Sequence, residues 1–344
     1  MGDLLPAADS GGDGVNAGPL AVLLEDPEVT DVLVNGVQVW VDRGDGLTRS
    51  QITMGSHEEV RRLAQRLAAA CGRRLDDGSP YVDGQLSDGS RLHAVLPPIA
   101  TGGPYLSLRT FRLRARPLDE LVAAPLAQLL SAVVVARLSF LISGGTGSGK
   151  TTLLNAMLAT ISARERIVVV EDAAELNPAH PHVLGLQARP SNVEGAGAVC
   201  LSDLVRQALR MRPDRLVVGE CRGVEVVDLL SALNTGHEGG ASTIHANTSA
   251  DVAVRLETLG LLGGLPLPAL RAQVAAAFQV VIHLRRTSAG REPAEICLLR
   301  RSGPGGALTM WPVWSSEAGL GPAASQLARM LTARSVRPPA WLQP

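Results

Sequence analysis

The spacing of apolar residues changes near residue 118, and this change predicts two differently built regions. Before it, the alternating runs Val-Leu-Val (32–34) and Val-Trp-Val (39–41) indicate strands, and the Asn35-Gly36 pair between them indicates a hairpin. Residues 56–71 have helical spacing instead, and Ser56 with Glu59 forms a capping-box pattern. Further strand-like runs follow at 85–86, 91–96 and 105–110. We therefore expect a small α+β domain over residues 19–111.

After residue 118, apolar strand-like runs alternate with helical patterns. This alternation predicts a mostly parallel sheet with helices on both faces, which is an α/β fold. The expected helices cover residues 118–136, 150–161, 201–211, 224–233 and parts of 250–277. The expected strands cover residues 138–143, 167–171, 183–187, 215–218, 241–245, 277–284 and 295–300.

The remaining segments complete a two-domain organisation. Residues 1–18 are rich in Gly, Asp and Ala and are expected to be a disordered tail. An arginine-rich linker spans 112–117, and the second domain spans 118–301. Residues 302–344 are rich in Gly, Pro and Ser, contain one short helical pattern near 324–333, and are expected to be a C-terminal extension.

Composition narrows the possible functions. The chain has 344 residues, 46% of them hydrophobic, and a formal net charge of −1, which gives no reason to expect direct binding to nucleic acid. Its longest apolar stretches are too short to cross a membrane, so a cytoplasmic protein is expected. Of the 32 basic residues only one is a lysine, Lys150. Because all the other basic residues are arginines, the single lysine suggests a site that needs an ammonium and at which a guanidinium cannot replace it.

Lys150 belongs to a phosphate-loop pattern, GxxxxGK[ST], at residues 144–151. An apolar strand leads into the loop and a helix leads out of it, so loop amides and the helix N-terminus can surround phosphate oxygens. The alternative is a flexible Gly/Ser turn. The position of the single lysine at the lysine site of the pattern, between a strand and a helix, argues against it. The predicted ATP-binding residues are Gly144, Gly145, Thr146, Gly147, Ser148, Gly149, Lys150, Thr151 and Thr152, with Thr151 as a ligand of Mg²⁺.

Two acidic residues end apolar strands and are candidates for catalysis. Glu171 follows Ile-Val-Val-Val, and Glu220 follows Leu-Val-Val-Gly. Because ligands of parallel sheets lie at the carboxyl ends of strands, both carboxylates are expected near the phosphate loop. Either one is then placed to activate water, alongside Lys150. Alternatively such acids cap a following helix, as Asp172 or Glu175 would.

Two histidines, His237 and His245, flank a short strand among glycines and polar residues. Their spacing is a weak metal signal, whereas a histidine that donates to a γ-phosphate or water suits them better. A purely structural hydrogen bond is an equal alternative for each. The other histidines, His283 among them, form no recognisable constellation in the sequence.

These motifs together resemble the motor ATPases of bacterial type II and type IV secretion and type IV pilus systems, most of all those of tight-adherence (Flp-type) pilus assembly and conjugal transfer. The phosphate loop is similar to residues 144–152 and the aspartate box to 171–175. The divergent second nucleotide motif is similar to 210–222, where Gly-Glu stands in place of Asp-Glu, and the histidine box to 235–247.

The resemblance implies a RecA-like phosphate-loop domain preceded by a smaller α+β domain. It also implies that Arg91, Arg109 and Arg222 are candidate sensors of the γ-phosphate, although ordinary ion-pair arginines are equally compatible with the sequence. Glu220 would act on water or on Mg²⁺, directly or through a water molecule, and Glu171 is the other candidate for that role.

The resemblance further implies a homohexameric ring in the cytoplasm that attaches to the inner membrane through a platform protein. ATP hydrolysis there powers pilus assembly or secretion. Two rivals stay open: a DNA-directed motor of conjugation or recombination with the same core, and a nucleotide-gated scaffold that does not hydrolyse ATP.

Overall fold

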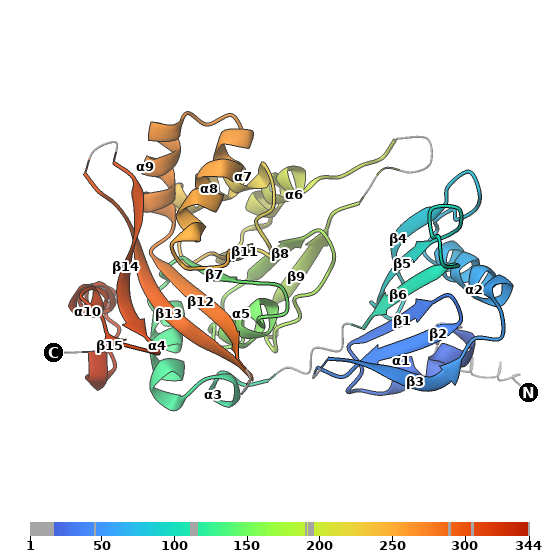
Figure 1. The fold of residues 1–344 in the computed structure, drawn as a ribbon. Coiled ribbons are helices and arrows are strands. Elements are labelled where there is room, and N and C mark those ends of the chain that lie inside the picture. The colour runs from blue at the N-terminus through green and yellow to red at the C-terminus, as the bar shows by residue number, and fades with distance from the viewer. Residues whose placement is uncertain are drawn as a thin grey trace, which may run out of the picture. The chain divides into compact units, whose positions relative to one another are not determined.

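The computed structural model describes residues 17–342 except 45, 111–115, 190, 192–195, 288–289 and 304–305. It separates into two compact units, 1–112 and 113–344, which are described one at a time (Figure 1). Residues 112–115 of the predicted linker and almost all of the predicted tail lie outside the described residues. Ala17, at the end of that tail, is fully buried in the first unit.

The first unit is built on an antiparallel sheet with the order β3-β2-β1-β6-β5-β4 in the described residues. Its strands are β1 (Asp31–Asn35), β2 (Gln38–Asp42), β3 (Leu47–Thr53), β4 (Tyr81–Gln85), β5 (Arg91–Val95) and β6 (Tyr105–Arg109). Its helices are η1 (Gly18–Leu20), α1 (Ala21–Glu25) and α2 (His57–Ala70). The predicted α+β character is therefore confirmed.

Local sequence signals explain several of these elements. Asn35 pairs with Gln38, so β1 and β2 are joined by a two-residue turn in which Gly36 has a φ of +63°. The Ser56 side chain accepts from the Glu59 amide at 3.2 Å and so caps α2. Strand β3 was missed because its residues alternate between exposed and half-buried positions and carry little apolar signal.

The second unit is a mixed sheet with the order β15-β14-β13-β12-β7-β11-β10-β8-β9 among the described residues. Neighbouring strands from β12 to β9 run parallel, and β13–β15 are added antiparallel. The parallel strands are β7 (Phe140–Gly144), β8 (Ile167–Glu171), β9 (Val183–Gln187), β10 (Arg215–Val218), β11 (Ala241–His245) and β12 (Val280–Thr287). The others are β13 (Gly290–Arg301), β14 (Leu308–Ser315) and β15 (Gly319–Leu320).

Helices cover both faces of this sheet (Figure 1). One face carries α3 (Leu118–Leu121), α4 (Ala124–Val135), α5 (Lys150–Leu158) and α10 (Ala324–Ala333). The other carries α6 (Leu201–Ala208), η2 (Leu209–Met211), α7 (Glu225–Asn234), α8 (Asp251–Leu262) and α9 (Leu267–Ala277). Phe140 and Ile142 of β7 belong to the first core, and Leu141 between them belongs to the second, as a strand buried on both faces requires.

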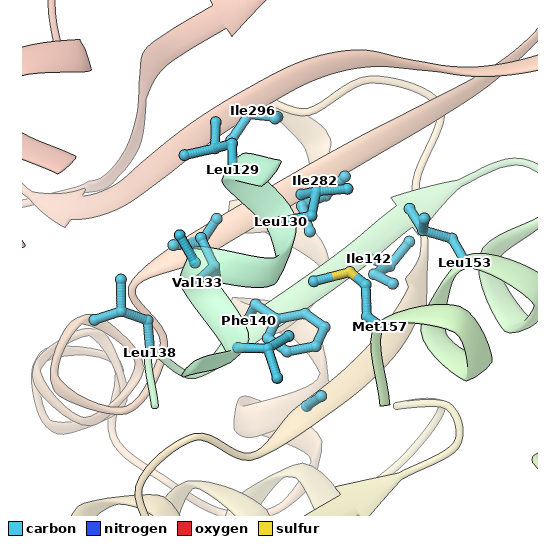
Figure 2. Close-up of a cluster of buried hydrophobic side chains, with 14 of the residues drawn as sticks. Leu129, Leu130, Val133, Leu138, Phe140, Ile142, Leu153, Met157, Ile282 and Ile296 are labelled. Carbon is cyan, nitrogen blue, oxygen red and sulfur yellow. The ribbon is translucent and has the colours of Figure 1, made fainter. Parts of the chain in front are cut away.

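The first core joins the helix before β7 to the helix after the phosphate loop. Figure 2 shows Leu130 and Val133 of α4 beside Phe140 and Ile142 of β7, with Met157 of α5 and Ile282 of β12 in the same cluster. A rigid apolar layer therefore lies behind β7 and α5 and fixes the base of the loop that joins them.

Three predicted elements are corrected by the structure. The single helix expected over 118–136 is two helices, because Pro125 begins a new one. Residues 302–344 are an integral part of the second unit, since β14 joins the sheet and Leu327 of α10 is fully buried in the core. No described helix lies between β8 and β9, so Asp172 and Glu175 do not cap one.

Candidate nucleotide site

The predicted phosphate loop is a loop between β7 and α5. Gly144, Gly147 and Gly149 have φ values of +153°, +70° and +91°, which side chains disfavour and glycine allows. A Cβ on Gly144 would lie 2.5 Å from Ser148 Oγ and 2.6 Å from the Leu284 carbonyl oxygen. The glycines of the motif therefore serve a compact curl of backbone at the N-terminus of α5.

Lys150 lies beneath this curl with only 7% of its surface exposed. Its ammonium donates to the carbonyl oxygens of Gly144 at 3.0 Å and Gly145 at 2.9 Å. Burial lowers the Lys150 pKa, and the nearby Glu220 carboxylate opposes that shift. The ammonium is thus held at the loop by backbone oxygens that a triphosphate can replace.

His245, at the end of β11, connects Lys150 with Glu220. Its Nδ1 lies 3.4 Å from Lys150 Nζ, and its Nε2 lies 2.8 Å from Glu220 Oε1. An ammonium can only donate, so Nδ1 accepts and Nε2 carries the hydrogen that faces the carboxylate. Burial lowers the His245 pKa, which is consistent with a neutral ring between a cation and an anion.

Glu220 lies just after β10, with its side chain 16% exposed. Its Oε2 accepts from Arg222 Nε at 2.6 Å. Its buried Oε1 has no aligned hydrogen-bond donor among the described residues, so the neutral His245 ring approaches it without a well-aligned hydrogen bond. This places the predicted residues Glu220, Arg222, His245 and Lys150 at one point, although they come from the loop after β10, the end of β11 and the start of α5.

Glu171 is buried, and its carboxylate is directed into its own loop. Its Oε1 accepts from the amides of Glu175 at 3.1 Å and Leu176 at 3.0 Å. Burial raises the Glu171 pKa to about 7 despite these hydrogen bonds. Glu171 therefore shapes the segment 172–176, and another carboxylate of this segment lies beside the phosphate loop.

That carboxylate belongs to Glu175, which the sequence suggested only as a helix cap. Its Oε2 lies 3.5 Å from the Thr151 hydroxyl, at the start of α5. Asn155, one turn further along α5, accepts from the Asn177 amide at 2.9 Å and ties the same segment to the helix. The sequence signal that could have identified Glu175 is its spacing from Glu171 within residues 171–175.

Two further residues hold the loop around Glu220. A Cβ on Gly219 would lie 2.6 Å from Glu171 Cγ, so glycine lets the two acidic loops approach each other. Glu225 is buried, and its Oε1 accepts from the amides of Arg222 at 2.7 Å and Gly223 at 2.8 Å. The glycine that precedes Glu220 in this motif therefore has a steric reason.

The remaining candidates are His237 in the second unit and Arg91 and Arg109 in the first unit. His237 contacts the Ala232 carbonyl oxygen at 3.3 Å, at the end of α7, in keeping with the structural alternative. Arg91 and Arg109 face each other across β5 and β6 in the first unit, and Arg109 Nε lies 3.9 Å from Asp31 Oδ1.

The site fits Mg²⁺ and a nucleotide on its own chemistry. Two buried side-chain oxygens, Ser148 Oγ in the loop and Glu220 Oε1 beside Lys150, lack an aligned hydrogen-bond partner among the described residues. Thr151 and Glu175 supply the hard oxygen ligands that Mg²⁺ prefers when phosphates complete its shell. Within the described part of the chain, no three His, Cys, Asp or Glu side chains form a metal cluster of their own.

The second unit is a RecA-like phosphate-loop domain of the α/β class, and the smaller first unit that precedes it is α+β. The chain belongs to the type II/IV secretion system protein family, whose model matches residues 13–299.

Individual relatives agree with this assignment. A putative conjugal transfer protein of Mycobacterium tuberculosis is 55% identical over 332 residues, which cover 93% of this chain and 94% of the relative. A type IV secretion system protein of Bordetella pertussis, PtlH, is 33% identical over 75% of this chain and 86% of its own length. The fold is similar to that of the pilus retraction motor PilT with bound ADP, with a TM-score of 0.59, 21% identity, and coverage of 83% of this chain and 82% of that one.

Proposed function

We propose that this protein binds ATP with Mg²⁺ at residues 144–152 and hydrolyses it. The observation that carries the proposal is the convergence of Lys150, His245 and Glu220 beside the phosphate loop, with Glu220 Oε1 left without an aligned donor. A buried carboxylate oxygen of this kind is suited to orient a water molecule and to take its proton.

Each residue has a defined part in the reaction. A water oxygen forms a bond to the γ-phosphorus, the bond to the β–γ bridging oxygen breaks, and the water proton passes to Glu220 and then to solvent. Lys150 and the loop amides neutralise charge on the phosphate oxygens. Thr151, with Glu220 or Glu175, would hold Mg²⁺, and the ion would supply further positive charge to the phosphates when bound.

Glu171 was the other candidate for activating water. The hydrogen bonds of its carboxylate to the amides of Glu175 and Leu176 support a positioning role, with Glu175 as the residue it presents.

Phosphate release by the purified protein tests this assignment. Lys150→Ala should abolish hydrolysis and weaken nucleotide binding, because the loop loses its ammonium; Arg164→Ala, at an exposed arginine, is the control. Glu220→Gln should retain ATP and slow turnover by at least about a hundredfold. Unchanged turnover in Lys150→Ala would refute the site. Normal turnover in Glu220→Gln would move the role to the 171–175 segment, and binding without any wild-type turnover would select the scaffold alternative.

We further propose that the protein is a homohexameric, cytoplasmic motor attached to the inner membrane through a platform protein. Its work would be assembly of a tight-adherence type pilus or secretion. Membership of the secretion family supports this role. None of the described helices is long and apolar enough to span a bilayer, so the proposed attachment is through a partner.

A second candidate is a DNA-directed motor of conjugation, which the 55% identity to a putative conjugal transfer protein supports. Such a motor should be stimulated by DNA in a steeply salt-dependent way. The net charge of −1 argues for cargo handled through partners instead. Hydrolysis measured with and without duplex and single-stranded DNA, at low and physiological salt, decides between the two candidates.

A further inference from the structure

A buried polar cluster lies directly behind the phosphate loop, and its centre is His283 of β12. His283 is 7% exposed and pairs in the sheet with Ser143, the residue immediately before Gly144. Its Nδ1 lies 3.0 Å from Ser143 Oγ, and Ser143 itself is fully buried. One side of the ring is therefore attached to the strand that carries the phosphate loop.

The same ring also reaches the segment that follows His245. Burial lowers the His283 pKa, and the nearby Asn247 backbone opposes that shift. Since β7 lies between β12 and β11 in the sheet, His283 bridges from one side of the loop strand to the segment after the strand on the other side.

Two neighbouring features fix His283 in this place. Its partner on β13 is Glu295, whose Oε2 accepts from Ser249, so the segment after His245 is tied to β13 as well. The pairing of β12 with β13 is irregular between His283 and Leu284, and Leu284 is the residue beside Gly144. Bulges of this kind re-aim side chains near functional sites.

We propose that His283 is a positioning residue that holds the phosphate-loop strand and the His245 segment in register. It acts through Ser143 and Asn247. In this way it sets the distances from Lys150 to His245 and to Glu220. The inference rests on the proposed hydrolysis of ATP and assigns to this reaction a residue outside the four family motifs.

The test is steady-state hydrolysis by the full-length protein, with ADP affinity and thermal unfolding measured on the same samples. His283→Ala should lower kcat by at least about tenfold, because a small misplacement of reacting groups is costly, while ADP binds nearly as in the wild type. Val281→Ala is the matched control, since Val281 is fully buried on the same face of β12 without polar contacts to the loop. It should lower the unfolding midpoint with little change in kcat.

Partial replacements identify the link. His283→Asn keeps a polar group where Nδ1 lies, and His283→Gln keeps one where Nε2 lies, so each should recover part of the rate. As a single substitution, Ser143→Ala should lower kcat. In the His283→Ala background it should add little, because both substitutions remove the same contact.

Three results would overturn the inference: a normal kcat in folded His283→Ala, a kcat loss that merely follows the unfolding midpoint as it does in Val281→Ala, or full additivity with Ser143→Ala. Absence of turnover in the wild-type protein would refute the proposed function together with this role, whereas a normal rate in His283→Ala would refute this role alone.

Discussion

At the scale of single residues, close approach of backbone and side chains explains the motif. Gly219 is glycine because Glu171 occupies the space of its Cβ, and Gly144 is glycine because Ser148 and Leu284 do so. Lys150 is the only lysine of the chain, and its ammonium bonds two loop carbonyls. Sequence reasoning found these residues because their chemistry is local. It placed His283 in no constellation, because Ser143 reaches it only through the pairing of β12 with β7.

Glu171 gives the stability of the protein a pH dependence. Its pKa is about 7 in the folded protein and near its ordinary value of 4.5 when unfolded. The folded state therefore binds more protons between these values, and the free energy of unfolding should fall as pH rises from about 5 to about 8, by up to about 3 kcal/mol. Glu171→Gln keeps an acceptor for the two amides and should remove this slope.

Urea unfolding of both proteins across this pH range measures the effect. The difference between the two unfolding free energies should change with pH in the direction given, while each variant keeps its own transition slope. Parallel pH curves for the wild type and Glu171→Gln would contradict the raised pKa.

At the scale of elements, amphipathic periodicity worked where helices and strands have one clear face or are buried on both. It located α2, α5, α10 and β7–β12 to within a few residues. It failed for β14, whose Trp311, Pro312 and Trp314 lie in the segment that the sequence predicts to be a C-terminal extension. Neighbouring β13 supplies the hydrogen bonds that make this segment a strand, which no local pattern encodes.

The C-terminal helix α10 should contribute strongly to the stability of the second unit. Leu327→Ala removes a fully buried side chain from the core shared with α4 and β7, and should cost about 2–5 kcal/mol. Arg329→Ala, on the exposed side of the same helix, should change stability by no more than about 0.5 kcal/mol. Equal unfolding midpoints for the two variants would show that α10 is a separate appendage.

At the scale of the whole molecule, each unit has its own core, and the second carries the phosphate loop, both acidic loops and the histidine at the end of β11. The site lies at the carboxyl ends of β7, β8, β10 and β11, where a parallel sheet gathers its loops. Family membership adds the expectation of a ring, which belongs to the assembly and not to either unit.

Sedimentation velocity with ATP and Mg²⁺ should reveal a species near six times the mass of one chain, because the proposed motor works as a homohexamer. Lys150→Ala, which should bind nucleotide weakly, is the control and should favour smaller species. A strict monomer at every protein and nucleotide concentration would count against the ring.

The sequence by itself determined the phosphate loop, the division into an α+β and an α/β region, and most helix and strand positions, because each rests on the period and chemistry of neighbouring residues. Only the tertiary structure decided which carboxylate faces which group. Glu220 meets His245 and Lys150, Glu175 meets Thr151, and Glu171 turns into its own loop. The reason is physical: the order of strands in the sheet sets these distances. It brings together residues far apart in the chain, as in the contact of Lys150 with His245, 95 positions away.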